Sequence, residues 1–204
     1  TFPAFPAGVQ RKVLKMGAIE QSIVYIATGS SIPLEPGDEE LQTPFAGLLD
    51  MRLRNRIRED LGATYNVSVN GGIEWYPAQR HLFQLSFGCE PARCEELIDI
   101  VLELLRELLE EGPTSEEVTA LREQRRRSLE SDRRTNRFWL DQVMHEIKND
   151  RPLSRIANEE RILTPITVEA LHNFARRYLT LEDDHDGAIL IRGSLPHLEA
   201  QPLL

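Results

Sequence analysis

The segment from position 38 to position 69 constrains the fold of this chain most, because it joins a long helical pattern directly to an alternating strand. Apolar residues recur at spacings of three and four, which predicts an amphipathic helix over 38–61. Asp38 is the expected N-cap of this helix and Gly62 its expected C-terminal stop. Apolar and polar residues then alternate over 65–70, the pattern of a half-buried strand. The helix and the strand are therefore expected to be adjoining elements of one domain.

The remaining pattern predicts strands in hairpins followed by packed helices. The expected strands cover 11–17, 21–27, 65–70, 83–87 and 188–191, and the expected helices cover 38–61, 95–111, 115–149 with a break near 131–136, and 167–178. Gly71-Gly72 is expected to interrupt its strand, and Thr114 with Glu117 to form a capping box. This order indicates an α+β fold in which a mostly antiparallel sheet is covered by helices on one face. Residues 1–204 are expected to form a single domain.

Composition excludes some classes of function. With 204 residues, 41% hydrophobic and 28% charged, the chain has the profile of an ordinary globular protein. Its net charge of -9 argues against a nucleic-acid binder, which usually carries a basic footprint. No run of 18 or more apolar residues is present, so no membrane span is expected. The chain begins at Thr1 rather than at a methionine, which suggests a processed product or a fragment of a longer, multi-domain protein.

The histidines test whether the chain can hold a metal. No two of the five histidines are four residues apart, so neither H-E-x-x-H nor H-x-x-E-H occurs. In the nearest match, His145-Glu146-Ile147-Lys148-Asn149, an asparagine replaces the second histidine, and a solvated helix face is the expected structure. The acidic run 183–186, which contains His185, is expected to be an exposed turn. No metal site is therefore expected in this chain.

Nucleophilic catalysis also lacks a motif. No G-x-S-x-G elbow or Gly-rich phosphate loop is present, and Cys89 has no histidine near it in sequence. Cys89 and Cys94 lie at a predicted strand end and helix start, where they are either two thiols or a disulfide in an oxidising compartment. The arginine-rich run 125–137 is interleaved with acidic residues, which favours a salt-bridged solvent face over a phosphate site.

Arg58 and Tyr65 form the most distinctive pair of reactive side chains. Arg58 lies in the last turn of the predicted helix and Tyr65 at the start of the next strand, so both are expected at one corner. A guanidinium and a phenol there can grip a carbonyl oxygen or an oxyanion. Both residues also have ordinary structural roles, since arginine in a last helical turn complements the helix dipole and tyrosine is common in strands.

The run R-E-D-L-G-A-T-Y-N-V-S, from Arg58 to Ser68, resembles the R-E-x-x-G-x-x-Y-x-V-x segment of the insulinase/pitrilysin-type zinc peptidases, relatives of mitochondrial processing peptidase. The turn at 111–114 and the closing strand with Gly193 also fit, so the resemblance covers most of the chain. Such peptidases are built from paired homologous α/β domains. One half binds zinc through H-x-x-E-H, and the later half lacks zinc and contributes an arginine and a tyrosine to the substrate site. Because this chain has no H-x-x-E-H, it resembles the non-catalytic C-terminal half.

The resemblance implies the zinc-free, substrate-binding half of a metalloendopeptidase, inactive as an isolated chain. It implies that Arg58 and Tyr65 contact the peptide substrate and its transition state. The zinc would be held across the cleft by a homologous partner domain, on the same polypeptide or on a separate subunit. The alternatives are a structural or interaction module derived from the same fold, and a self-sufficient enzyme that uses Cys89 or His145. The expected compartment is the bacterial periplasm, with the cytoplasm as the alternative.

Overall fold

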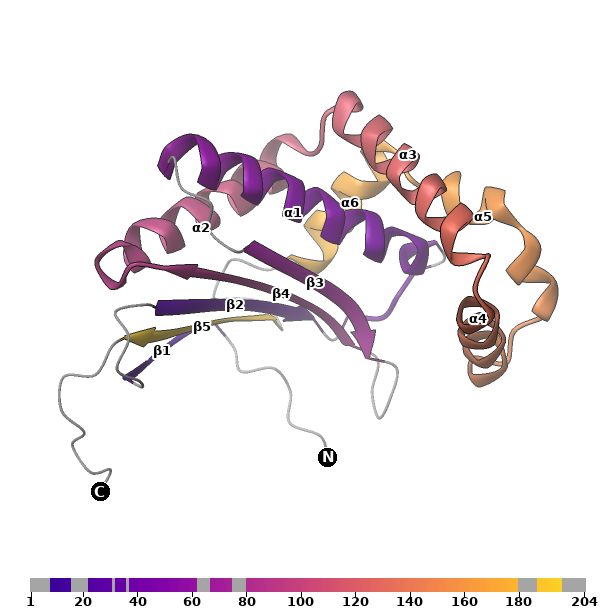
Figure 1. The fold of residues 1–204 in the computed structure, drawn as a ribbon, viewed down its shortest axis with the longest axis horizontal. Helices are drawn as coiled ribbons and strands as arrows, with labels where there is room; N and C mark the ends of the chain where they lie inside the picture. Colours follow the sequence, from indigo (N-terminus) through magenta and orange to yellow (C-terminus); the bar gives the residue numbers. More distant parts are fainter. Residues whose placement is uncertain are drawn as a thin grey trace, which may run out of the picture.

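The chain folds into two layers, a β-sheet and a set of helices that cover one of its faces (Figure 1). The computed structural model describes residues 8–15, 22–30, 32–35, 37–61, 67–74, 80–179 and 187–195.

The arrangement of the sheet agrees with the predicted α+β fold. Within the described residues it has five strands: β1 (Gly8–Lys15), β2 (Ser22–Ser30), β3 (Val67–Glu74), β4 (Arg80–Cys89) and β5 (Gly187–Leu195). Their spatial order is β1-β5-β2-β4-β3, which makes β1 and β3 the edge strands. β1 pairs with β5 in parallel, and the other neighbouring pairs are antiparallel. The prediction of a mostly antiparallel sheet covered on one face is therefore confirmed.

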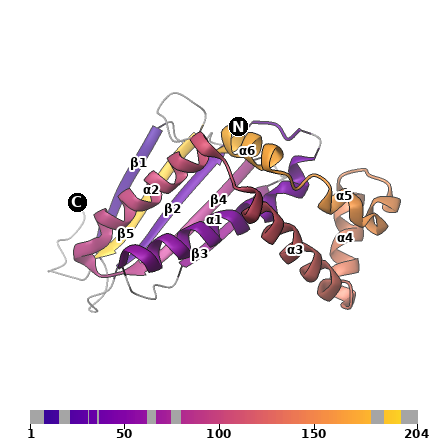
Figure 2. The same ribbon diagram turned by 90° about the horizontal axis from the view of Figure 1, so that it is seen from above.

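The helices divide into those over the sheet and those beyond it. The described helices are α1 (Asp38–Leu61), η1 (Pro91–Arg93), α2 (Cys94–Glu111), α3 (Ser115–Asp132), α4 (Asn136–Lys148), η2 (Leu153–Ala157), α5 (Glu159–Leu163) and α6 (Val168–Tyr178). α1, α2 and α6 lie over the sheet, whereas α3, α4 and α5 extend past its end (Figure 2). We call residues 115–163 the helical arm. None of the described helices is long and apolar enough to cross a membrane.

The core lies between the sheet and the helices that cover it. Alternate residues of β2 and β4 are buried: Val24, Ile26, Phe83, Leu85 and Phe87. The apolar stripe of α1 joins the same cluster: Phe45, Leu48, Leu49, Leu53 and Ile57. On β2, Ile23 and Tyr25 are exposed, so the strand alternates between the core and the uncovered face of the sheet. The apolar residues that recur with the helical period and those that recur with the strand period thus pack into one core.

β3 runs through Gly71-Gly72, where the sequence predicted an interruption. A Cβ atom at Gly71 would lie 2.6 Å from the ring of Phe83 and 3.2 Å from Cβ of Ala46. The glycine therefore lets β3 approach the Phe83 ring and α1 closely instead of ending the strand. The prediction was wrong because glycine marks strand breaks and close approaches alike.

The predicted break in the long helical tract is present, since α3 ends at Asp132 and α4 begins at Asn136. At the start of α3, Oγ1 of Thr114 accepts a hydrogen bond from the amide of Glu117 at 3.2 Å, and the Glu117 carboxylate accepts one from the amide of Thr114 at 2.7 Å. The predicted capping box is therefore confirmed. The short helix α5 was not predicted.

Candidate functional site

α1 carries charge at both ends, and the two ends have different surroundings. Three acidic residues occupy its first turn: Asp38, Glu39 and Glu40. Four arginines alternate with other residues near its carboxyl end: Arg52, Arg54, Arg56 and Arg58. The predicted site residue Arg58 belongs to this second group.

The predicted pair Arg58 and Tyr65 lies partly outside the described residues. The backbone of Arg58 belongs to α1, but its side chain and the whole of Tyr65 are not among the described parts of the chain. The carbonyl oxygen of Val67, at the start of β3, accepts a hydrogen bond from Nη2 of Arg54 at 2.6 Å. The last turns of α1 and the start of β3 are therefore adjacent. A joint action of Arg58 and Tyr65 stays a prediction.

Two other arginines of this stretch hold neighbouring helices. Nε and Nη2 of Arg52 donate to the two carboxylate oxygens of Glu117, at 2.7 and 2.8 Å, and Nη2 also donates to the carbonyl oxygen of Gly112 at 2.8 Å. Burial raises the pKa of Glu117, but the hydrogen bonds from Arg52 and Thr114 and the charge of Arg52 together outweigh this effect, and the net shift is downward. Nη2 of Arg56 donates to Glu107 on α2 at 3.1 Å. Arg52 and Arg56 thus have structural partners.

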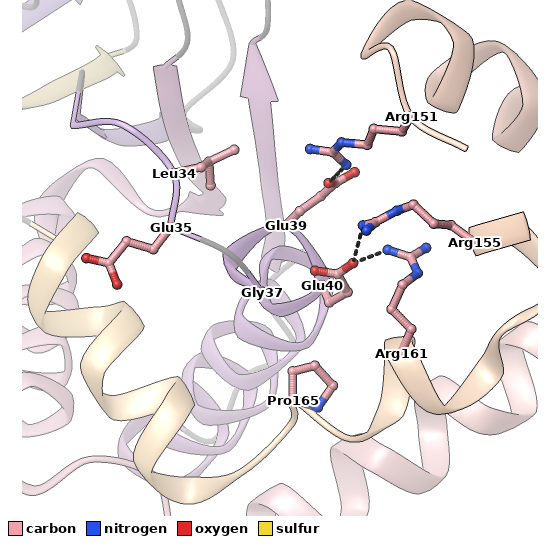
Figure 3. A pocket seen from close by; sticks show the side chains of 9 residues that line it. All are labelled: Leu34, Glu35, Gly37, Glu39, Glu40, Arg151, Arg155, Arg161 and Pro165. Atoms are coloured by element: carbon pink, nitrogen blue, oxygen red, sulfur yellow. Dashed lines mark hydrogen bonds and ion pairs between the residues drawn. The ribbon is translucent and has the colours of Figure 1, made fainter. Parts of the chain in front are cut away.

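The amino end of α1 lines a cavity of about 440 Å³ that faces the helical arm (Figure 3). Glu39 points toward Arg151, and Glu40 points toward Arg155 and Arg161. The Glu40 side chain is 7% exposed, contacts Nη1 of Arg161, and lies 3.6 Å from Nη2 of Arg155. Carboxylates of α1 therefore meet guanidinium groups of the arm at a partly buried junction.

Glu39 connects α1 to the arm through two partners. One carboxylate oxygen contacts Nε2 of His145, and the other accepts a hydrogen bond from Nη1 of Arg151. Burial raises the pKa of Glu39, but the hydrogen bond from Arg151 and the charges of His145 and Arg151 lower it overall. The carboxylate is thereby kept ionised.

The nearest match to a zinc motif, residues 145–149, belongs to the same contacts. Glu146 is 1% exposed and lies 3.4 Å from Nε of Arg155 and 3.8 Å from Nη2 of Arg161. Nδ2 of Asn149 donates to the carbonyl oxygen of His145 at 2.8 Å. The expected solvated helix face is therefore wrong, because this face of α4 turns its charges inward toward α1, η2 and α5. We call the whole set the ion-pair network: Glu39, Glu40, His145, Glu146, Arg151, Arg155 and Arg161.

The ion-pair network had no local signal in the sequence. Glu39 and Arg151 are 112 positions apart, and Glu40 and Arg161 are 121 positions apart. Its three guanidinium groups are matched by three carboxylates, so little charge is left for a ligand. The arrangement is suited to fastening the arm to α1.

Asp38 begins α1, but its carboxylate makes tertiary contacts. Oδ2 accepts hydrogen bonds from the Tyr178 hydroxyl at 2.5 Å, from Nη1 of Arg177 at 3.0 Å and from the amide of Glu35 at 2.8 Å. Burial and the hydrogen bond to Asp38 raise the pKa of Tyr178 to about 12. The Tyr178 ring stacks on His81, with ring centroids 3.7 Å apart. The predicted N-cap therefore anchors α6 to the amino end of α1.

His81 is a buried histidine beside this cluster. Its Nδ1 lies 2.5 Å from Nε2 of Gln42, and its side chain is 0% exposed. Burial lowers the pKa of His81 to about 4, although the charge of Asp38 acts in the opposite direction. At neutral pH the ring is uncharged and enclosed, which suits a role in the core.

The remaining candidates give no complete site. Among the described residues, no three histidine, cysteine, aspartate or glutamate side chains gather so that they could hold a metal ion. His185 and the acidic run 183–186 lie outside the described residues. In the arginine-rich run, Nε of Arg137 pairs with Asp141 at 2.6 Å, with both side chains more than half exposed, as a salt-bridged surface requires. Burial raises the pKa of Cys89 to about 12, which opposes its use as the nucleophile of a peptidase.

Comparisons with known proteins point to one family. The family model described as the peptidase M16 inactive domain matches residues 15–125. The zinc protease PQQL-like of Arabidopsis thaliana is 29% identical over 104 residues, which cover 48% of this chain and 11% of that protein. The probable zinc protease PqqL of Escherichia coli (strain K12) is 26% identical over 130 residues, which cover 63% of this chain and 14% of that protein. The chain thus corresponds to a small part of each curated relative.

Solved structures share the fold. The periplasmic protease PqqL from Escherichia coli superposes with a TM-score of 0.77 at 21% identity, over 97% of this chain and 21% of that chain. The inactive peptidase domain of a putative zinc protease from Bordetella parapertussis gives a TM-score of 0.65 at 12% identity, over 93% of this chain and 97% of that chain. The first half of PqqL also matches, with a TM-score of 0.63 at 13% identity, over 92% of this chain and 42% of that chain.

The family model covers more than half of the chain, and the sheet and helices agree with those of the solved structures. The resemblance seen in the sequence is therefore confirmed: the chain belongs to the peptidase M16 family, as one of its inactive domains.

Proposed function

We propose that this chain is the zinc-free, substrate-binding half of a metalloendopeptidase. The observation that carries the proposal is the run from Arg58 to Ser68, which lies within the residues matched by the inactive-domain model and matches the arginine-tyrosine segment of this peptidase class. The placement of this run at the junction of α1 and β3 supports it. β3 is an edge strand of the described sheet, and an extended peptide can pair with such an edge.

In this proposal the chain contributes charge stabilisation rather than a metal. Zinc on the partner would supply the activated water that attacks the scissile carbonyl. The guanidinium of Arg58 and the phenol of Tyr65 would donate hydrogen bonds to the carbonyl oxygen as negative charge develops on it. A preplaced donor of this kind typically contributes about 2.7–4 kcal/mol to transition-state stabilisation.

The proposed partner is a homologous zinc-bearing domain, on the same polypeptide or on a separate subunit. The likeness of this chain to the first half of PqqL supports pairing between domains of one fold. PqqL of Escherichia coli is described as periplasmic, and we propose the same compartment for this chain, with the cytoplasm as the alternative.

The proposal is tested by reconstitution. The chain, its zinc-bearing partner and their mixture are assayed for cleavage of a quenched fluorescent peptide library, with and without chelator. We expect cleavage by the mixture alone, its loss in chelator, and a reduction of kcat by about 10²- to 10³-fold for Tyr65→Phe. Equal cleavage by the partner without this chain would overturn the substrate-binding role.

A second candidate, an interaction module with no part in cleavage, is favoured by one surface of α4. Leu140, Met144 and Ile147 follow each other at spacings of four and three, and they are 59%, 44% and 59% exposed. An apolar helix stripe of this kind suits contact with another protein. If this candidate holds, the partner binds the chain, and Asp substitutions at Leu140 and Met144 abolish binding, while Tyr65→Phe leaves peptide cleavage unchanged.

A further inference from the structure

Two buried thiols touch where the sheet meets the helix layer. Cys89 is the last residue of β4, Cys94 is the first residue of α2, and their Sγ atoms are 3.3 Å apart. Both are free cysteines, 2% and 9% exposed. We propose that Cys89 and Cys94 are a site of reversible oxidation, at which an external disulfide converts them into an intrachain disulfide.

The backbone between the two cysteines already forms the required turn. The amide of Arg93 donates to the carbonyl oxygen of Glu90 at 3.0 Å, and the amide of Cys94 donates to the carbonyl oxygen of Pro91. A disulfide bond is about 2.05 Å long, so the sulfur atoms need to approach by about 1.2 Å. Side-chain rotation within this short turn can supply such a movement, and the secondary structure on either side is unchanged.

The surroundings of the two sulfur atoms set the order of reaction. Cys94 lies nearer the surface, so its thiolate attacks a sulfur of the external disulfide RSSR, forms a mixed disulfide and releases one RSH. Cys89 then gives up its proton and displaces the second RSH, which closes the Cys89–Cys94 bond. Overall, two protein thiols are oxidised to one disulfide, and RSSR is reduced to two RSH. Burial and the contact with Cys94 raise the pKa of Cys89, which agrees with its acting second.

Oxidation of Cys89 and Cys94 would link two elements of the fold, because the two cysteines lie at the end of β4 and the start of α2. Cys89 pairs with Ser22 of β2, and Phe87, two residues earlier, pairs with Val67 at the start of β3. The disulfide therefore ties α2 to the strand beside β3, at the end of the sheet where α1 and β3 adjoin. Because the closed loop is short, the gain in stability is modest, and we expect Tm to rise by about 5 °C.

The folded chain is incubated with oxidised glutathione, and its intact mass, free thiols and non-reduced tryptic peptides are measured. We expect the mass to fall by two hydrogens and both thiols to disappear. Trypsin should release the peptides 81–93 and 94–106 joined by a disulfide. Reduced dithiothreitol should restore both thiols and the original Tm. Retention of both thiols by the folded chain, or a disulfide between two chains, would overturn the proposal.

Two single variants test the order of attack without depending on the stability of the disulfide. Cys89→Ser leaves the outer thiol, and we expect it to gain one glutathione from oxidised glutathione. Cys94→Ser leaves the inner thiol, and we expect it to react at least ten times more slowly while folded. Equal rates for the two folded variants would contradict the assigned order. Oxidation of the wild-type chain only after addition of urea would contradict a site that reacts in the folded state.

Discussion

The two ends of α1 are both rich in charge, yet their charges have different surroundings. At the amino end, Glu39 and Glu40 are held by side chains of the helical arm more than 100 positions away. At the carboxyl end, Arg52 holds the turn before α3, and Arg58 continues toward the junction with β3. Charged side chains that pair with other parts of the chain, such as Glu40 and Arg52, stabilise the fold. Arg58 belongs to a family motif at the junction of α1 and β3, so it is the residue to test for substrate binding.

The largest effect on stability is expected at the amino end. Glu40→Gln removes the carboxylate that Arg161 and Arg155 share and leaves Glu146 as the one carboxylate that these two guanidinium groups face in the ion-pair network. We expect the free energy of unfolding to fall by about 3 kcal/mol. Urea denaturation measures this change, and Glu130→Gln, at an exposed position of α3, is the matched control with little expected effect. A change below about 0.5 kcal/mol for Glu40→Gln would show that the amino end is no more structural than the surface.

The next effect is a pH dependence of stability from His81. Its pKa is about 4 in the folded protein and about 6.5 when exposed, so the unfolded chain binds a proton first as the pH falls. Stability is therefore fully present above pH 6.5 and is lost as the pH falls toward 4, by about 2.5 kcal/mol at pH 4.5. Urea denaturation at pH 7.5 and 4.5 measures the loss. His81→Phe keeps an aromatic ring beside Tyr178 and should reduce this pH-dependent loss of stability. An equal loss in the variant would mean that groups other than His81 cause the pH dependence.

A smaller effect is expected where Arg52 joins α1 to the α2–α3 turn. Arg52→Ala removes the paired hydrogen bonds to Glu117 and the one to the Gly112 carbonyl oxygen. We expect the free energy of unfolding to fall by about 1.5 kcal/mol, measured by thermal or urea denaturation. Thr114→Ala, which removes only the cap, should cost about 1 kcal/mol. A larger loss of unfolding free energy for Thr114→Ala than for Arg52→Ala would mean that the cap, and not Arg52, is the main support of the α2–α3 turn.

The smallest effect is expected at Arg54. Its side chain is 47% exposed, pairs with Asp50 at 2.7 Å, and donates to the carbonyl oxygen of Val67. We expect Arg54→Ala to lower the free energy of unfolding by about 0.5 kcal/mol. A loss as large as that of Glu40→Gln would mean that Arg54 too is a structural anchor, through its hydrogen bond to Val67.

Features with a local cause were predictable from the sequence. The helix over 38–61 follows from its apolar period and the glycine after it, and the capping box at Thr114 follows from the spacing of two residues. The prediction at Gly71 was wrong because a glycine in a strand pattern marks either a break in the strand or a close approach of another element. Only the position of the Phe83 ring in the folded chain decides between the two.

A candidate substrate site is predicted from the sequence only where a motif names its residues. Arg58 and Tyr65 are candidates because they lie in a contiguous run of residues that resembles a family segment, and their role stays a prediction. The ion-pair network could not be found in this way, because each ion pair joins residues that the chain brings together only after the arm has folded back onto α1. His145 and Glu146 were therefore assigned to a solvated face, although Glu146 is 1% exposed.

We propose that Arg58, at the carboxyl end of α1, serves substrate binding, while Arg52 on the same stretch of the helix serves the fold. It is tested most directly by measuring kcat and Tm for Arg58→Ala and Arg52→Ala in the protease reconstituted with its zinc-bearing partner. We predict that Arg58→Ala lowers kcat by about 10²-fold or more with an unchanged Tm, and that Arg52→Ala lowers Tm with a nearly unchanged kcat. Full activity of Arg58→Ala, or a loss that only accompanies a lower Tm, would contradict the account.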